Sequence, residues 1–144
     1  MSKTFKIFTA GKMGGLSYRE QMDWRRELEH KLYDIIAPST INFIHPPLFF
    51  DYSSPNQEMA KQWEINQLIN SDIVVFNLSN IQDSLGTIME LGIIEGINRV
   101  RERKIFTVGI GVPNFEHPWL ESALFKRTYT VEEAAEFIVD YLLI

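Results

Sequence analysis

Short apolar runs alternate with longer segments of helical period along the whole chain. The runs are only a few residues long and rich in Val, Ile and Phe, which is typical of strands covered on both faces. We expect strands at residues 5–10, 41–44, 73–76, 105–108 and 128–129. Between them, helical periodicity of the apolar residues predicts helices over 17–37, 57–70, 87–101 and 130–142, with a helical turn at 119–125.

This alternation is that of an α/β protein with a mostly parallel sheet and helices on both faces. Five such strands predict a flavodoxin-like three-layer sandwich with strand order 2-1-3-4-5, and residues 1–144 are expected to form a single domain. In this order the carboxyl ends of the first and third strands lie side by side. The loop Gly11–Gly15 and the segment Asp83–Glu90 are therefore expected to face each other across one crevice, where open α/β sheets bind ligands.

Local signals add detail to this outline. The segments Ser17–Glu20 and Thr130–Glu133 have the Ser/Thr-x-x-Glu spacing of a capping box, so each is expected to begin a helix. The aromatic segment 48–56 has no clear period, and it fits packing of its rings on the core as well as it fits a lid over a pocket. The buried stripe of the first helix is predicted to comprise Trp24, Leu28, Leu32 and Ile35.

Composition and charge exclude several classes of function. A net charge of -5 supplies no basic surface for a nucleic-acid backbone, and the chain has no cysteine for a disulfide or a thiolate metal site. No run approaches the roughly 20 apolar residues that span a bilayer, and residues 1–6 lack the apolar core of a signal peptide. We therefore expect a cytoplasmic protein without nucleic-acid or membrane partners. The histidines lack metal-ligand spacing and the glycines of 11–15 match neither a dinucleotide nor a Walker A loop, so no metal or cofactor is expected.

Two carboxylates flank the third strand and the turn after it, Asp72 before the strand and Glu90 after the turn. One interpretation is structural: Thr87-x-x-Glu90 is a capping-box spacing, and Asp72 would cap the entry to the strand. The other interpretation is chemical and has about equal weight. A carboxylate in the first turn of a helix is held ionised by the helix dipole, and one that faces a crevice is a nucleophile or a base.

Several segments, in the right order, resemble the nucleoside 2-deoxyribosyltransferase superfamily, which includes the 2'-deoxynucleoside 5'-phosphate N-hydrolases. Those segments are Lys6–Met13, Ser71–Asp72 and Ser84-Leu85-Gly86-x-x-x-Glu90-Leu91-Gly92. Ile44-His45-Pro46 is similar to the end of that family's second strand, and Glu64, eight residues before Asp72, stands where the family often has Asp. The resemblance covers nearly the whole chain and implies a flavodoxin-like fold with chemistry at an N-glycosidic bond.

The resemblance also implies roles for particular residues. Glu90 matches the nucleophile that attacks C1' of the sugar, and Asp72 matches the carboxylate that contacts the leaving base and helps to protonate it. The implied substrate is a (deoxy)nucleoside or its 5'-monophosphate, and the implied assembly is a homo-oligomer, at least a dimer. The residues expected to bind the substrate are Phe8, Gly11, Lys12, Met13, Asp83, Ser84, Gly86 and Thr87.

Two departures from the family pattern leave the function open. Phe8 stands where the family often has Tyr, which favours an alternative function as a non-catalytic, flavodoxin-like module that binds a nucleotide as a sensor or docking domain. Ser84 stands where transferases often have Asp, as it does in the phosphate-binding hydrolases. Ser84, Lys12 and the first amides of the helix can receive a 5'-phosphate, whereas an inward-pointing Asp83 would repel it. Transfer and hydrolysis both remain possible on the sequence.

Overall fold

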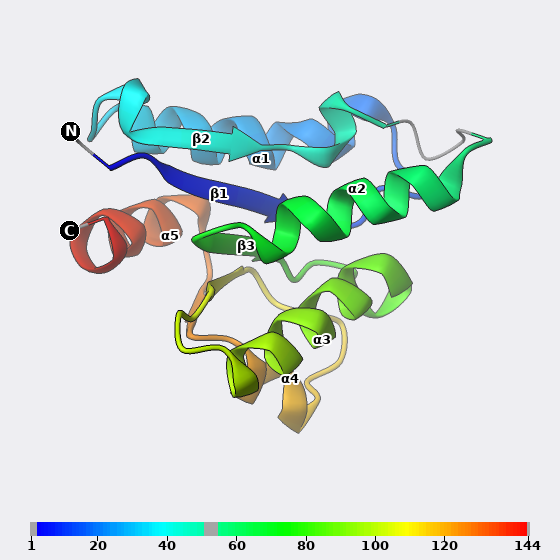
Figure 1. The fold of residues 1–144 in the computed structure, drawn as a ribbon. Helices are drawn as coiled ribbons and strands as arrows, with labels where there is room; N and C mark the ends of the chain where they lie inside the picture. Colours follow the sequence, from blue (N-terminus) through cyan, green and yellow to red (C-terminus); the bar gives the residue numbers. More distant parts are fainter. Residues whose placement is uncertain (1–2, 51–54, 144) are drawn as a thin grey trace.

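A computed structural model describes residues 3–50 and 55–143 and contains one five-stranded sheet with order β2-β1-β3-β4-β5. All four strand pairings are parallel. This arrangement confirms the predicted flavodoxin-like α/β fold (Figure 1). The strands are β1 Phe5–Ala10, β2 Ile41–Ile44, β3 Ile73–Asn77, β4 Phe106–Ile110 and β5 Lys126–Thr128.

Helices lie on both faces of the sheet (Figure 1). The helices are α1 Tyr18–Tyr33, α2 Gln57–Ile69, α3 Leu85–Val100, α4 Pro118–Ala123 and α5 Val131–Phe137, and a π-helical turn at Ile138–Leu142 continues the last of them. Alternate residues of β3 point to opposite faces, as the strand pleat requires. Ile73 and Val75 pack in the core under α1 and α5, whereas Val74 and Phe76 pack under α2 and α3.

The capping signals in the sequence are confirmed. Ser17 and Glu20 form a reciprocal capping box at the start of α1. At the start of α5, the side chain of Thr130 accepts a hydrogen bond from the backbone N–H of Glu133, at 3.1 Å. Each pair satisfies backbone donors that a helix N-terminus leaves free.

The predicted stripe of α1 is correct in part. Leu28 and Leu32 are fully buried, and Trp24 packs at the edge of the core. Ile35 is 50% exposed, because α1 ends at Tyr33 and the following turn takes Ile35 out of the helical phase. The face toward the sheet contains Arg25 instead, and this arginine is 0% exposed.

The aromatic segment before α2 packs on that helix. The ring of Phe49 lies 4.5 Å from that of Trp63, centroid to centroid, and Phe50 lies 5.2 Å from the same ring. Both interpretations are met in part, because these rings pack on α2 and Phe50 also lines a cavity beside that helix. Tyr52 lies outside the described residues. In the described parts of the chain, none of the helices combines the length and apolar character needed to cross a membrane.

Candidate functional site

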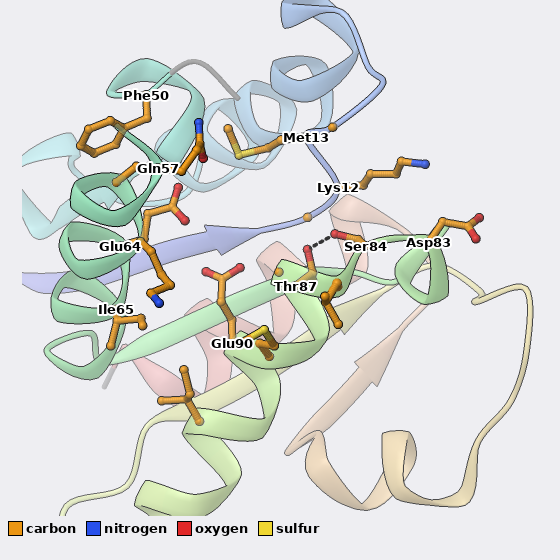
Figure 2. A pocket seen from close by; sticks show the side chains of 18 of the residues that line it. Lys12, Met13, Phe50, Gln57, Glu64, Ile65, Asp83, Ser84, Thr87 and Glu90 are labelled. Atoms are coloured by element: carbon orange, nitrogen blue, oxygen red, sulfur yellow. Dashed lines mark hydrogen bonds between the residues drawn. The ribbon is translucent and has the colours of Figure 1, made fainter. Parts of the chain in front are cut away.

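A cavity of about 580 Å³ opens at the carboxyl end of β1 and β3, between the loop after β1 and the helices α2 and α3. The loop Gly11–Gly15 forms one wall, the side of α2 that includes Glu64 forms another, and the segment Asp83–Glu90 forms a third (Figure 2). The expectation that the glycine loop and the 83–90 segment share one crevice is therefore confirmed. Predicted residues that line the cavity are Gly11, Lys12, Met13, Asp83, Ser84, Gly86, Thr87 and Glu90.

The first glycine of the loop is required by close packing. A Cβ on Gly11 would lie 2.9 Å from Cζ2 of Trp24 and 3.3 Å from Cβ of Asn77. Gly15, at the far end of the loop, has a positive φ of +79°, which L-residues with side chains rarely adopt. The loop can therefore leave β1 in close contact with Trp24 of α1 and expose its backbone to the cavity.

The start of α3 places short polar side chains on the cavity wall. Ser84 is the N-cap residue, and its Oγ lies 2.7 Å from Oγ1 of Thr87 (Figure 2). Thr87 is already inside the helix, so the predicted capping box of Thr87 with Glu90 does not form. Glu90 lies beyond the first turn of α3, and its side chain points into the cavity (Figure 2).

A second carboxyl group, that of Glu64 on α2, points into the same cavity (Figure 2). Burial, together with the negative charge of Glu64, raises the pKa of Glu90 to about 8, against the opposing charge of Arg25. Burial also raises the pKa of Glu64, against the opposing charge of Arg25. Oε2 of Glu90 is buried and has no hydrogen-bond partner among the described residues. The expectation that a helix dipole keeps Glu90 ionised is wrong, because burial and a neighbouring acid dominate.

Asp72 is not part of this cavity, and the predicted pairing of Asp72 with Glu90 is wrong. Asp72 precedes β3, whereas the cavity lies beyond the other end of that strand, about 15 Å away at the usual rise per residue. Oδ2 of Asp72 accepts a hydrogen bond from the backbone N–H of Lys6, at 2.8 Å, and Oδ1 pairs with Arg103. Asp72 lines a separate hollow at the amino edge of the sheet. Its contacts are those of a residue that joins β1, β3 and the loop before β4.

The prediction that Phe8 binds substrate is also wrong. Phe8 is 0% exposed, and it packs with Leu68, Val74 and Phe76 in the core between the sheet and α2. It lies two residues before the end of β1, and the strand pleat turns its side chain into the core. The exchange of Tyr for Phe at this position therefore gives no information on ligand binding.

Two residues of the site region were missed as site residues by the sequence analysis. Glu64 was identified only as a position where the resembling family often has Asp, and its place on the inner side of α2 makes it the partner of Glu90. Arg25 lies behind the cavity and acts on both carboxyl groups by its charge. A signal for Arg25 existed, because it shares the helical phase of Leu28 and Leu32 and so falls on the buried face.

Comparison with known proteins places the fold. No protein-family model and no curated protein matches the chain. Among solved structures, a crystal structure of a conserved protein from Enterococcus faecalis V583 is similar, with a TM-score of 0.74 and 15% sequence identity over 96% of this chain and 99% of that chain. The similarity shows that the chain has the flavodoxin-like α/β fold, and at this identity it shows the fold alone.

Proposed function

We propose that the protein cleaves or transfers at the N-glycosidic bond of a (deoxy)nucleoside or its 5'-monophosphate. The observation that carries the proposal is the pair of carboxyl groups, Glu64 and Glu90, which point into one cavity at the carboxyl edge of the sheet. Glycosidic bonds are broken by two acids that differ in protonation state. The resemblance to the nucleoside 2-deoxyribosyltransferase superfamily supports the same chemistry.

The proposed reaction is a double displacement. The Glu90 carboxylate attacks C1' of the sugar, the bond from C1' to the base nitrogen breaks, and the base leaves with a proton supplied through Glu64. Water or a second base then attacks C1' and releases Glu90. Because the charge of Glu64 raises the pKa of Glu90, Glu64 loses its proton first as the pH rises. In the protein without substrate, the one proton that the two acids share therefore lies on Glu90. This proton must pass toward the leaving base before Glu90 attacks.

The opposite end of the cavity suits a sugar hydroxyl or a 5'-phosphate. Ser84, Thr87 and the free amides at the start of α3 lie there, and Lys12 lies across from them on the glycine loop. The carboxylate of Asp83 points away from Glu90 and is exposed (Figure 2), which reduces its repulsion of an anion. A nucleoside 5'-monophosphate is therefore as compatible with this end as a nucleoside.

The experiment is incubation of the protein with deoxynucleosides and with deoxynucleoside 5'-monophosphates, each with and without a free acceptor base, followed by chromatography. A new nucleoside identifies a transferase, and free base with sugar or sugar phosphate identifies a hydrolase. Absence of turnover with every substrate contradicts the proposal. Ligand binding by calorimetry without turnover would instead support the non-catalytic nucleotide-binding module.

We further propose that the protein forms a homo-oligomer through the outer side of α3. Leu85, Ile88 and Met89 are 72%, 43% and 50% exposed, an unusual concentration of large apolar side chains in one helix. Leu85 and Met89 also line the cavity, so a neighbouring subunit on this surface would lie at the site.

A further inference from the structure

Arg25 is a charged side chain that the fold buries completely. It lies on α1 with its guanidinium 4.7 Å from the ring centroid of Trp24. Nε donates to Oγ1 of Thr9 at 3.1 Å, Nη2 lies 3.4 Å from the carbonyl oxygens of Thr9 and Gly11, and Nη1 donates to the carbonyl of Gln21. The guanidinium thus joins the end of β1, the first residue of the glycine loop and its own helix.

No carboxylate forms an ion pair with this guanidinium among residues 3–50 and 55–143. Burial lowers the pKa of Arg25 to about 10, and the charges of Glu90 and Glu64 oppose that change. Arg25 therefore remains a cation at neutral pH, in a place where an uncompensated charge is costly. Its compensation comes from carbonyl oxygens on one side and from the acids of the cavity on the other.

We propose that Arg25 is a positioning residue of the site, which fixes the Gly11 end of the glycine loop and holds negative charge on the Glu64–Glu90 pair. It does so from behind the cavity wall, because Arg25 itself does not line the cavity. The link to catalysis rests on the proposed function. The two structural effects, on the loop and on the charge of the acids, exist without a substrate and can be measured without one.

The ionisable groups around Arg25 come from three elements. Glu64 faces it from α2, and Glu90 faces it from α3. His45, after β2, has Nδ1 2.8 Å from Oγ1 of Thr9, the same hydroxyl that Nε of Arg25 contacts. Burial lowers the pKa of His45 to about 4, with the charges of Arg25 and Arg26 adding to the effect. At neutral pH the imidazole is therefore neutral, and the acids are the groups that respond to Arg25.

The test is a titration of the glutamate carboxyl carbons by NMR in the unmodified protein and in the Arg25→Gln and Arg25→Lys variants. The Glu90→Gln and Glu64→Gln variants assign the two signals. We expect Arg25→Gln to raise the titration midpoint of Glu90 by about one pH unit, a tenfold tighter hold on the proton. Arg25→Lys keeps the charge, so its midpoint should stay within about half a pH unit of that in the unmodified protein.

Two results would overturn the inference. The first is a folded Arg25→Gln variant, as judged by circular dichroism, whose Glu90 midpoint does not move. The second applies if Arg25→Gln does not fold: a Glu90 midpoint that moves by a whole pH unit in Arg25→Lys would show that the charge at position 25 is not what sets the protonation of the pair.

Activity separates this inference from the proposed function. If the unmodified protein turns over a nucleoside or nucleotide, the pH above which Arg25→Gln loses activity should move upward together with the Glu90 midpoint. If the unmodified protein is active and the pH profile of Arg25→Gln does not move, the role of Arg25 is contradicted and the proposed function is not. No turnover in the unmodified protein contradicts the proposed function, while the titration still decides whether Arg25 controls the charge of the pair.

Discussion

The residues that matter most at the site are two acids from different helices, Glu64 on α2 and Glu90 on α3. Sequence spacing identified Glu90 but paired it with Asp72, because both flank the same strand. The two flanks of a strand lie at opposite edges of its sheet, a whole strand length apart. Since ligands bind beyond the carboxyl ends, the acid before β3 was at the wrong edge. A helix such as α2, which runs back beside the sheet, brings Glu64 to the correct edge.

The first prediction concerns these acids. Glu90→Gln and Glu64→Gln should each lower kcat by about 10²–10⁴, because each removes a group that attacks or carries a proton. Steady-state turnover of the substrate found by chromatography measures the effect. Asp72→Asn is the matched control and should keep activity within about threefold, since it removes only contacts at the amino edge. A large loss in Asp72→Asn with normal activity in Glu64→Gln would contradict the assignment.

The second prediction concerns pH and activity. In the free protein the pair of Glu64 and Glu90 loses its last proton with the pKa of Glu90, about 8, and the proposed mechanism delivers that proton to the leaving base. The value of kcat/KM should therefore fall as the pH rises through about 8, because this ratio reports the free enzyme. A pH–rate series from about pH 5 to 10 measures it. A rise in kcat/KM through pH 8 would instead show that the pair must lose this proton before the reaction, and it would contradict delivery of the proton to the leaving base.

The third prediction concerns His45 and stability. Its folded pKa of about 4 lies below its ordinary value of 6.5, although Oε1 of Glu29 is 3.7 Å from Nε2, because burial outweighs that charge. Between these pH values the unfolded chain binds the extra proton, so stability falls as the pH falls from about 6.5 to 4. The loss is on the order of 3 kcal/mol at most.

Urea unfolding of the unmodified protein and of His45→Gln at several pH values measures this contribution. As the pH falls from about 6.5 to 4, the free energy of unfolding of the unmodified protein should fall relative to that of the variant. Glu90 acts in the opposite sense, since its raised pKa makes stability fall as pH rises from about 4.5 to 8. Only the difference between the two proteins therefore isolates His45, and equal slopes would contradict a buried neutral imidazole.

At the scale of elements, the sequence predicted most of the fold. The bounds of β1 and β2 agree with the prediction, and α2 ends one residue earlier than expected. Buried parallel strands must be continuous apolar runs, so their positions are visible in the sequence. The misplaced side chains were Phe8 and Ile35. Ile35 was misplaced because the end of α1 is weakly encoded in the sequence. Phe8 was assigned to the site by resemblance, although the pleat of a correctly bounded β1 turns its side chain into the core.

The fourth prediction concerns the join between β1 and the glycine loop. Gly11→Ala should destabilise the fold by about 1–3 kcal/mol, because the new Cβ would overlap the ring of Trp24. Gly96→Ala is the control: nothing lies within 4 Å of a Cβ there, the residue is exposed within α3, and alanine should stabilise it by about 0.5–1 kcal/mol. Denaturant unfolding measures both, and an unchanged Gly11→Ala protein would show that the ring moves freely.

At the scale of the whole molecule, strand order determines where the site lies. The order 2-1-3-4-5 was predicted from the alternation of elements, and it brings the ends of β1 and β3 together. The cavity followed from that order, including most of its predicted lining. The contribution of α2 did not follow, because the apolar residues of this helix form no clear stripe, so its sequence does not show which side faces the sheet and the cavity.

The fifth prediction concerns assembly. If the outer side of α3 is an interface between subunits, Leu85→Glu should shift the protein from an oligomer to a monomer in sedimentation, because a charge cannot be buried there unpaired. Val100→Glu is a suitable control, since Val100 is 88% exposed at the far end of the same helix. Sedimentation of the unmodified protein as a monomer would contradict the proposed oligomer.

The hollow that contains Asp72 also includes Lys3 and Leu142, so both ends of the described chain lie at the amino edge of the sheet (Figure 1). The cavity opens at the opposite edge. A fluorescent reporter or a sensor chip attached beside Lys3 or Leu142 would therefore leave the cavity mouth open to solution. The same geometry makes the molecule suitable for immobilised assays of its ligands.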